Sequence, residues 1–168
     1  MSLAALFLPF LMTISMSNDS LPPRGFAASS SIHSSAAVNR TRMLQLVNEA
    51  RAKGCKCGTV YYNAVPPLNW NEQLEKAAQN HVNDMYQKKY FSHTASDGSN
   101  AGIRMERAGY KWMTYGENIA TGFVNEKEVV EGWLKSPGHC KNLMSKNFKE
   151  IGVARNGNLW TQTFGRKL

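Results

Sequence analysis

The sequence predicts an α+β domain in which helices cover a small antiparallel sheet. Helical patterns come first along the chain and strand patterns follow, an order that favours this class over alternating parallel βαβ units. The second expected helix has a strong apolar periodicity. Near the C-terminus, Asn156-Gly157 separates two apolar runs. This pair indicates a hairpin because Asn-Gly readily adopts the positive φ values of a tight turn.

The domain is expected to occupy residues 39–168 of the 168-residue chain. An apolar run at residues 3–12 is too short to span a bilayer and is typical of a secretory leader, so residues 1–17 are predicted to be a signal peptide. Residues 18–38 are rich in Ser, Ala and Pro and are predicted to be a disordered linker. The protein is therefore expected to be secreted, either extracellular or periplasmic.

Two helices open the domain. Arg40–Lys53 has apolar residues at spacings of three, and Gly54 follows where a helix commonly ends. Asn71–Lys89 begins at a residue that can cap a helix, and its apolar residues fall on one face. That face consists of Leu74, Ala77, Ala78, His81 and Met85. Because His81 lies on this face, it is expected to be a buried core histidine.

Shorter elements complete the prediction. They are a helix at Asn100–Arg107, a strand at Tyr115–Thr121, a helix at Asn125–Leu134 and the two hairpin strands Ile151–Ala154 and Leu159–Phe164. Trp133 is expected to pack inward from the fourth helix. Pro137-Gly138 is expected to end that helix, since proline disfavours helical geometry in the residue before it.

The charge is basic, with 20 Lys and Arg against 12 Asp and Glu and a net charge of +8. Residues 135–168 contain seven basic residues and one acid, Glu150. This segment suggests an anionic surface as a partner, such as cell-wall polymers or lipid headgroups, although an ordinary solvated surface is the simpler interpretation. Nucleic acid is not expected, because no basic helix or Arg-rich groove motif accompanies the charge.

Common catalytic signatures are missing from the sequence. It has no Gly-rich phosphate loop, no His-Glu-x-x-His and no Gly-x-Ser-x-Gly. These absences argue against nucleotide enzymes, common zinc proteases and α/β-hydrolases.

Three spaced motifs remain, and their order and gaps are informative. They are Phe91-Ser92-His93-Thr94-Ala95-Ser96-Asp97-Gly98, Gly116-Glu117-Asn118-Ile119-Ala120 and Ser136-Pro137-Gly138-His139. With them, the chain from Arg40 to Gly165 resembles the CAP superfamily of cysteine-rich secretory proteins, antigen 5 and pathogenesis-related proteins, in its short bacterial SCP-like form. The resemblance implies an α-β-α sandwich with an open cavity lined by two histidines and two acidic residues.

Carried over to this sequence, the resemblance implies that His93, Glu117 and His139 line the cavity. Ser136 stands where larger secreted members have a second glutamate. Ser136 and Asn118 complete the predicted cavity residues, and Asn118 is expected to anchor backbone rather than to contact a substrate.

These residues leave three interpretations open. His93, Glu117 and His139 could form a hydrogen-bonded cluster that fixes the loops around the sheet. His93 and His139 could instead bind zinc reversibly, since imidazoles are good ligands for this ion, although no cofactor is required. In the third interpretation, a metal-dependent hydrolase, Glu117 would be the candidate general base.

Three cysteines allow one disulfide and one remaining thiol. In an exported protein, a bridge from Cys140 to Cys55 or Cys57 is expected. The rival is a metal site formed by the three cysteines and His139. It is less favoured because the adjacent His139 and Cys140 would have to point the same way.

The sequence thus favours a secreted, monomeric, non-enzymatic binding module for an extracellular lipid, glycan or protein ligand. The alternatives are a metal-dependent hydrolase that uses His93, His139 and Glu117, and an adhesive protein that acts through its basic C-terminal face.

Overall fold

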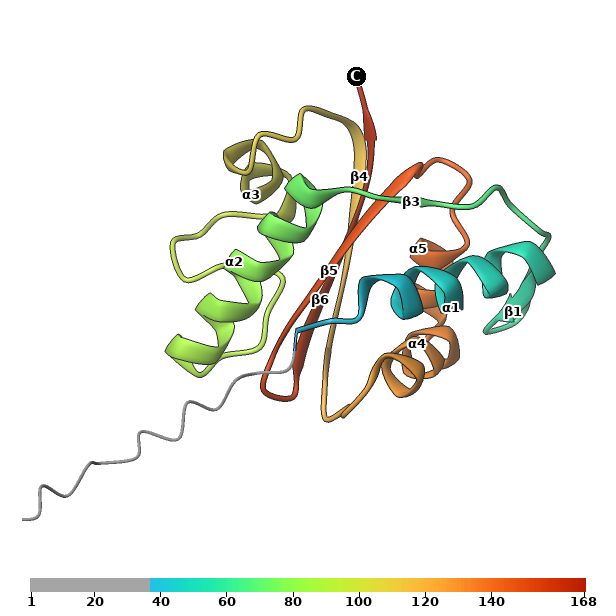
Figure 1. Cartoon of the computed structure of the whole chain (residues 1–168), viewed down its shortest axis with the longest axis horizontal. Coiled ribbons are helices and arrows are strands. Elements are labelled where there is room, and N and C mark those ends of the chain that lie inside the picture. The colour runs from blue at the N-terminus through green and yellow to red at the C-terminus, as the bar shows by residue number, and fades with distance from the viewer. Residues whose placement is uncertain (1–36) are drawn as a thin grey trace, which may run out of the picture. The chain divides into compact units, whose positions relative to one another are not determined.

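The computed structural model describes residues 37–168 (Figure 1). The predicted signal peptide at 1–17 and all but the last two residues of the predicted linker at 18–38 lie outside the described residues. The described elements are α1 (Arg40–Lys53), β1 (Cys55–Cys57), β2 (Val60–Tyr62), β3 (Asn69–Trp70), α2 (Glu72–Lys88), α3 (Ala101–Arg107), β4 (Trp112–Thr121), α4 (Glu126–Lys135), α5 (Pro137–Leu143), β5 (Glu150–Asn156) and β6 (Leu159–Lys167). The α+β class is therefore confirmed. None of the helices among residues 37–168 has the length and apolar character needed to span a membrane.

Asparagine side chains begin four helices. The side-chain oxygens of Asn39, Asn71, Asn100 and Asn125 accept hydrogen bonds from backbone N–H groups in the first turns of α1, α2, α3 and α4. Such caps satisfy donors that have no partner inside a helix. The expected helices at 71–89, 100–107 and 125–134 therefore agree with the structure to within one residue at each end.

The main sheet has the strand order β3-β5-β6-β4. The predicted hairpin is confirmed: β5 and β6 pair antiparallel, with Asn156 opposite Leu159, and Gly157 in the turn has φ 59°. β6 also pairs antiparallel with β4, which begins at Trp112, three residues before the predicted start. The sheet is not wholly antiparallel, because the two-residue strand β3 runs parallel to β5 at the edge.

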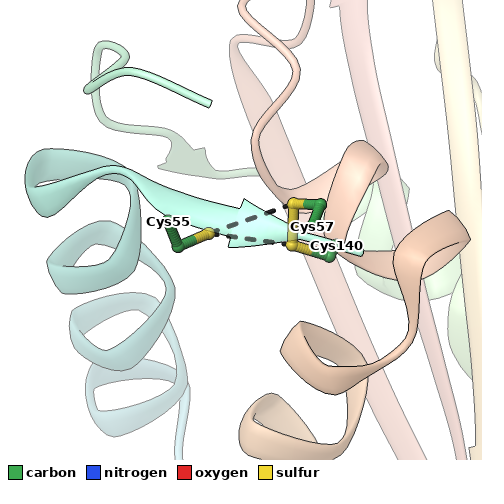
Figure 2. Close-up of side chains that lie close together, drawn as sticks. All are labelled: Cys55, Cys57 and Cys140. Carbon is green, nitrogen blue, oxygen red and sulfur yellow. Dashed lines mark hydrogen bonds between the residues drawn. A yellow bond between two sulfur atoms is a disulfide. The ribbon is translucent and has the colours of Figure 1, made fainter. Parts of the chain in front are cut away.

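A small hairpin and an additional helix were absent from the sequence prediction. β1 and β2 form a separate two-stranded sheet, which the Cys57–Cys140 disulfide joins to α5 (Figure 2). Pro137 does not merely follow α4; it begins α5. The first helical position suits proline because the N–H that proline lacks would have no intrahelical partner there.

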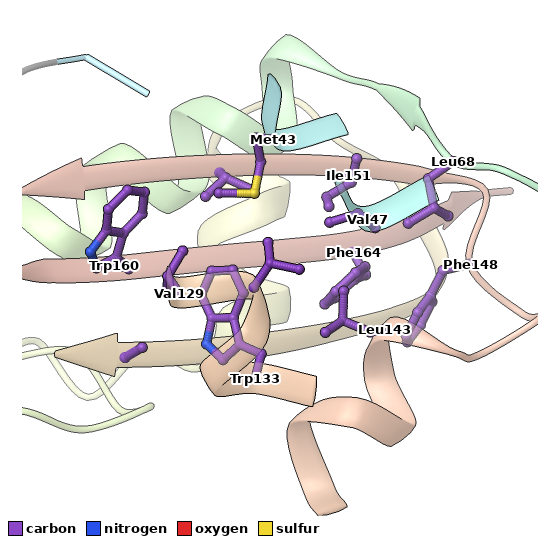
Figure 3. Close-up of a cluster of buried hydrophobic side chains, with 13 residues drawn as sticks. Met43, Val47, Leu68, Val129, Trp133, Leu143, Phe148, Ile151, Trp160 and Phe164 are labelled. Atoms are coloured by element: carbon purple, nitrogen blue, oxygen red, sulfur yellow. The ribbon is translucent and has the colours of Figure 1, made fainter. Parts of the chain in front are cut away.

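One face of the main sheet carries the largest hydrophobic core (Figure 3). The core lies between the sheet and helices α1, α4 and α5. The members labelled in Figure 3 are Met43, Val47, Leu68, Val129, Trp133, Leu143, Phe148, Ile151, Trp160 and Phe164. Trp133 is 1% exposed, which confirms its inward position.

The opposite face of the sheet is covered by α2 and α3, which gives the sandwich its second helical layer (Figure 1). Leu74, Ala77, Ala78, Val82 and Met85 of α2 are all buried there. Gly152 of β5 allows α2 to lie close, because a Cβ at this position would be only 2.0 Å from the backbone nitrogen of Glu75. His81 is fully buried on the same helix face, as predicted.

Candidate functional site

Glu117 lies at the centre of a buried polar cluster on β4. Its Oε2 accepts a hydrogen bond from Nη2 of Arg104 at 2.6 Å, and its Oε1 accepts one from Nδ1 of His93 at 2.8 Å. The side chains of Glu117 and Arg104 are 4% and 6% exposed. Arg104 comes from α3 and His93 from the loop after α2, so three segments meet at this carboxylate. Both carboxylate oxygens already have charged or polar partners.

The contact with Glu117 fixes the tautomer of neutral His93. A carboxylate accepts hydrogen bonds, so Nδ1 of His93 must carry the proton. The other ring nitrogen, Nε2, then has a free lone pair on a side chain that is 57% exposed. His93 is therefore a solvent-accessible imidazole held in one protonation pattern by a buried acid.

His81 lies beneath this cluster and contributes a second imidazole. Its Nε2 is 4.0 Å from Oε1 of Glu117 and donates to the carbonyl oxygen of Ser92 at 2.9 Å. Burial lowers the pKa of His81, a shift that the nearby charge of Glu117 partly opposes. The neutral ring thus holds the loop that carries His93 against α2.

Asn118 occupies the opposite face of the sheet from Glu117, since successive strand side chains alternate. Its Nδ2 donates to the carbonyl oxygen of His139 and to Oε1 of Gln162, and its Oδ1 accepts from Nδ2 of Asn142. Asn118 is completely buried. Its geometry is that of a residue that anchors α5 to the sheet.

His139 and Ser136 are positioned by α5. Ser136 links α4 to α5, and its carbonyl oxygen accepts the first helical hydrogen bond, from Cys140. The half-buried ring of His139 has a lowered pKa, mainly because of burial and secondly because of His93. Among the five residues predicted for the cavity, direct hydrogen bonds join His93 to Glu117 and Asn118 to His139.

A pocket of about 240 Å³ borders the cluster. Its walls include His81 and Arg104, which both approach Glu117, together with Asp84, Asp97 and Arg107. The lining residues of this pocket do not include His93, Glu117 or His139. Arg104 and His81, rather than Glu117 or His93, therefore face this space.

Sequence reasoning missed Arg104 as a member of the site. Arg104 lies in a short helix beside the apolar residues Ala101 and Met105, so the sequence places its charge on a helix face that packs inward. That pattern could have indicated a buried ion pair. Arg104 also donates to the carbonyl oxygen of Ser99 at 2.7 Å. It therefore connects the loop before α3 to the acid of β4.

The sulfur atoms of the three cysteines lie within 4.8 Å of one another, and this is the one such group of potential metal ligands found in residues 37–168. Cys57 and Cys140 are joined in a disulfide with a Cα–Cα distance of 5.4 Å, and Cys55 remains a thiol. The structure thus pairs Cys140 with Cys57 instead of Cys55. A four-ligand site of these cysteines with His139 is not formed, because the disulfide occupies two of the sulfurs.

Comparisons with known proteins identify the family and support the fold. The model of the family described as "CAP: Cysteine-rich secretory protein family" matches residues 44–164. The uncharacterized protein YkwD of Bacillus subtilis is 35% identical over 133 residues, an alignment that covers 78% of this chain and 48% of YkwD.

Two solved structures have a similar fold. An extracellular protein of Bacillus anthracis that contains a SCP domain has 31% identity and a TM-score of 0.68, over 76% of this chain and 40% of that one. An outer surface protein of Borrelia burgdorferi has a TM-score of 0.65 at 20% identity, over 80% of this chain and 99% of that one, and shows a likeness of fold alone.

This chain spans about half or less of the length of the two Bacillus proteins. The family match nevertheless covers most of the described residues, and the sandwich fold agrees with it. The chain therefore belongs to the CAP family of cysteine-rich secretory proteins, with a domain of the bacterial SCP-like type.

Proposed function

We propose that this protein is a secreted, non-enzymatic binding module whose polar site presents His93 and His139 to an extracellular ligand. The observation that carries the proposal is the state of Glu117. Its carboxylate is buried, paired with Arg104 at 2.6 Å and hydrogen-bonded to His93 at 2.8 Å. An acid held in this way orients other groups rather than reacting itself.

The same observation argues against the hydrolase alternative. A general base must accept a proton from a water or a reacting group within hydrogen-bond reach. Both oxygens of Glu117 already have partners, and the guanidinium of Arg104 compensates its charge. The side chain of Glu117 is also only 4% exposed, which leaves little room for a water to approach it.

The ligands proposed for a divalent metal are His93 and His139, without Glu117. Ligand atoms of His93, Glu117 and His139 do not form a group within 4.8 Å of one another among residues 37–168. Glu117 instead orients His93 through Nδ1, an arrangement typical of histidines whose other nitrogen binds zinc. His93 and His139 would hold the ion, and a bound zinc would supply a positive centre for an anionic ligand group.

The ligand class follows from the charge and from the expected location. Five basic side chains are exposed in the C-terminal part of the chain. They are Lys141 in α5, Lys146 and Lys149 between α5 and β5, and Arg166 and Lys167 at the end of β6. We expect an anionic lipid, glycan or protein outside the cell, bound by a monomer. Adhesion through the basic residues alone remains an alternative. It predicts salt-sensitive binding that survives His93→Ala, because screening weakens exposed charge pairs.

Calorimetric titration of the full-length protein with zinc tests the metal part of the proposal. The parent and Cys55→Ser are expected to bind zinc stoichiometrically, and His93→Ala/His139→Ala is expected to lose that binding. Cys55→Ser is the matched control because it removes the free thiol and leaves both histidines. Binding retained by the double variant, or no binding by the parent, would show that the histidines do not form a metal site.

A further inference from the structure

Cys55 is placed against the disulfide by strand geometry. Cys55 and Cys57 are two residues apart in β1, so their side chains share one face of the strand, and that face meets α5. Sγ of Cys55 lies 3.7 Å from Sγ of Cys140 and 4.0 Å from Sγ of Cys57 (Figure 2). A free thiol thus contacts both sulfurs of a disulfide.

Access from solvent differs among the three sulfurs. Cys57 is 5% exposed and Cys140 is fully buried, whereas Cys55 is partly exposed. The disulfide also lies in an apolar cluster with Met144, which Tyr62 and Val65 flank. An external reagent can therefore reach the thiol of Cys55 far more easily than the bond between the other two.

We propose that these three cysteines form a thiol–disulfide exchange site in which the Cys57–Cys140 bond migrates to Cys55–Cys140. The thiolate of Cys55 attacks Sγ of Cys140, the Cys57–Cys140 bond breaks, and Cys57 leaves with the electron pair as a thiolate. The proton released by Cys55 is balanced by the one that Cys57 takes up. The exchange needs no external oxidant or reductant.

Attack on Cys140 is favoured over attack on Cys57. Two same-face residues of a strand have Cα atoms about 6.6 Å apart, which is near the upper limit for a disulfide. A Cys55–Cys57 bond would therefore distort β1. The partner in α5 has no such constraint, and the distance from Cys55 to Cys140 is the shorter of the two.

The exchange is expected to be slow at neutral pH. Burial raises the pKa of the Cys55 thiol, so little of the attacking thiolate is present. The two distances are also nearly equal, which places Cys55 beside the bond and not along its axis. Because displacement at sulfur requires an attack along that axis, the side chains must first rotate.

Migration of the bond would affect the candidate site through α5. Cys140 directly follows His139, and the disulfide joins this helix to the β1–β2 hairpin. Exchange therefore transfers the covalent attachment of the helix that carries His139 from one residue of β1 to another.

Mapping the free thiol in the oxidised full-length protein tests this proposal. Samples are incubated at about pH 7 and about pH 9, stopped with acid, denatured and labelled with a maleimide. Trypsin cleaves after Lys56, so it separates Cys55 from Cys57 before mass spectrometry. The label is expected on Cys55 at first and then increasingly on Cys57. The rate should rise about tenfold per pH unit below the thiol pKa, because the thiolate is the nucleophile.

Two variants make the result decisive. Cys57→Ser is expected to form Cys55–Cys140 and to show no labelled thiol, while Cys55→Ser keeps the native bond as the matched control. Two labelled thiols in a folded Cys57→Ser protein would overturn the proposal. So would a label that stays on Cys55 in the parent at about pH 9, or a rate proportional to protein concentration, which would indicate exchange between molecules. If Cys57→Ser does not fold, the time course of the parent decides.

Discussion

Replacing Arg104 by Met isolates the buried ion pair that organises the candidate site. Methionine keeps much of the apolar volume of arginine but removes the charge that faces Glu117. The two side chains are 6% and 4% exposed, and their closest atoms are 2.6 Å apart. Removing one partner of such a pair costs about 3 to 5 kcal/mol, because the other charge stays buried without compensation.

Urea denaturation at neutral pH measures this cost as a change in the free energy of unfolding. A loss of about 3 to 5 kcal/mol is a large part of the total stability of a typical domain, about 5 to 15 kcal/mol.

The double variant Arg104→Met/Glu117→Gln separates charge burial from loss of contacts. It removes both charges, so its free energy of unfolding should recover to within about 1 to 2 kcal/mol of the parent. If Arg104→Met is as stable as the parent, or if the double variant is no better than the single one, the buried pair does not have the role described.

Three further predictions concern packing and pH. Trp133→Ala should lower the free energy of unfolding by about 3 to 5 kcal/mol because a fully buried ring is lost, and an unchanged denaturation midpoint would contradict the packing of α4. Gly152→Ala should lower the free energy of unfolding by about 1 to 3 kcal/mol or more, since its Cβ would meet the backbone of α2. Gly138→Ala, which lies in open space on α5, should instead raise it by up to about 1 kcal/mol. Equal effects of the two variants in thermal melts would refute this. The free energy of unfolding should fall as pH drops below about 6.5, because burial lowers the pKa of His81 in the folded protein and the unfolded chain therefore binds a proton there more readily. The fall between neutral pH and about pH 5 should be smaller in His81→Gln.

The resemblance to the CAP family, which rests on three short contiguous motifs, supplied the predicted cavity residues. His93, Glu117 and His139 were all selected in this way. Arg104, the ion-pair partner of Glu117, was not selected, since it belongs to no motif and reaches the acid only when α3 packs beside β4. The sequence likewise placed Asn118 next to Glu117 without deciding that the two side chains face opposite sides of the sheet.

The helices and strands can be predicted from the sequence to different degrees, for a related reason. Helices α2 and α4 have apolar faces, asparagine caps and lengths that can be recognised locally. The two-residue strand β3 has no pattern of its own, and it is a strand only because the backbone of β5 lies beside it. The short helix α5 is not predicted from the sequence, because Pro137-Gly138 indicates a helix end, although proline is equally suited to a first helical turn.

Local sequence patterns account for the α+β class, the principal helices, the hairpin at Asn156-Gly157 and the expectation of one disulfide from Cys140. Those features depend on residue spacing, capping and turn preferences, which act within a few positions of the chain. The folded structure was needed to show that Cys57 rather than Cys55 pairs with Cys140, and that Arg104 is the ion-pair partner of Glu117. Both outcomes depend on which side chains of distant segments come into contact, and packing of the two helical layers on the sheet sets those contacts.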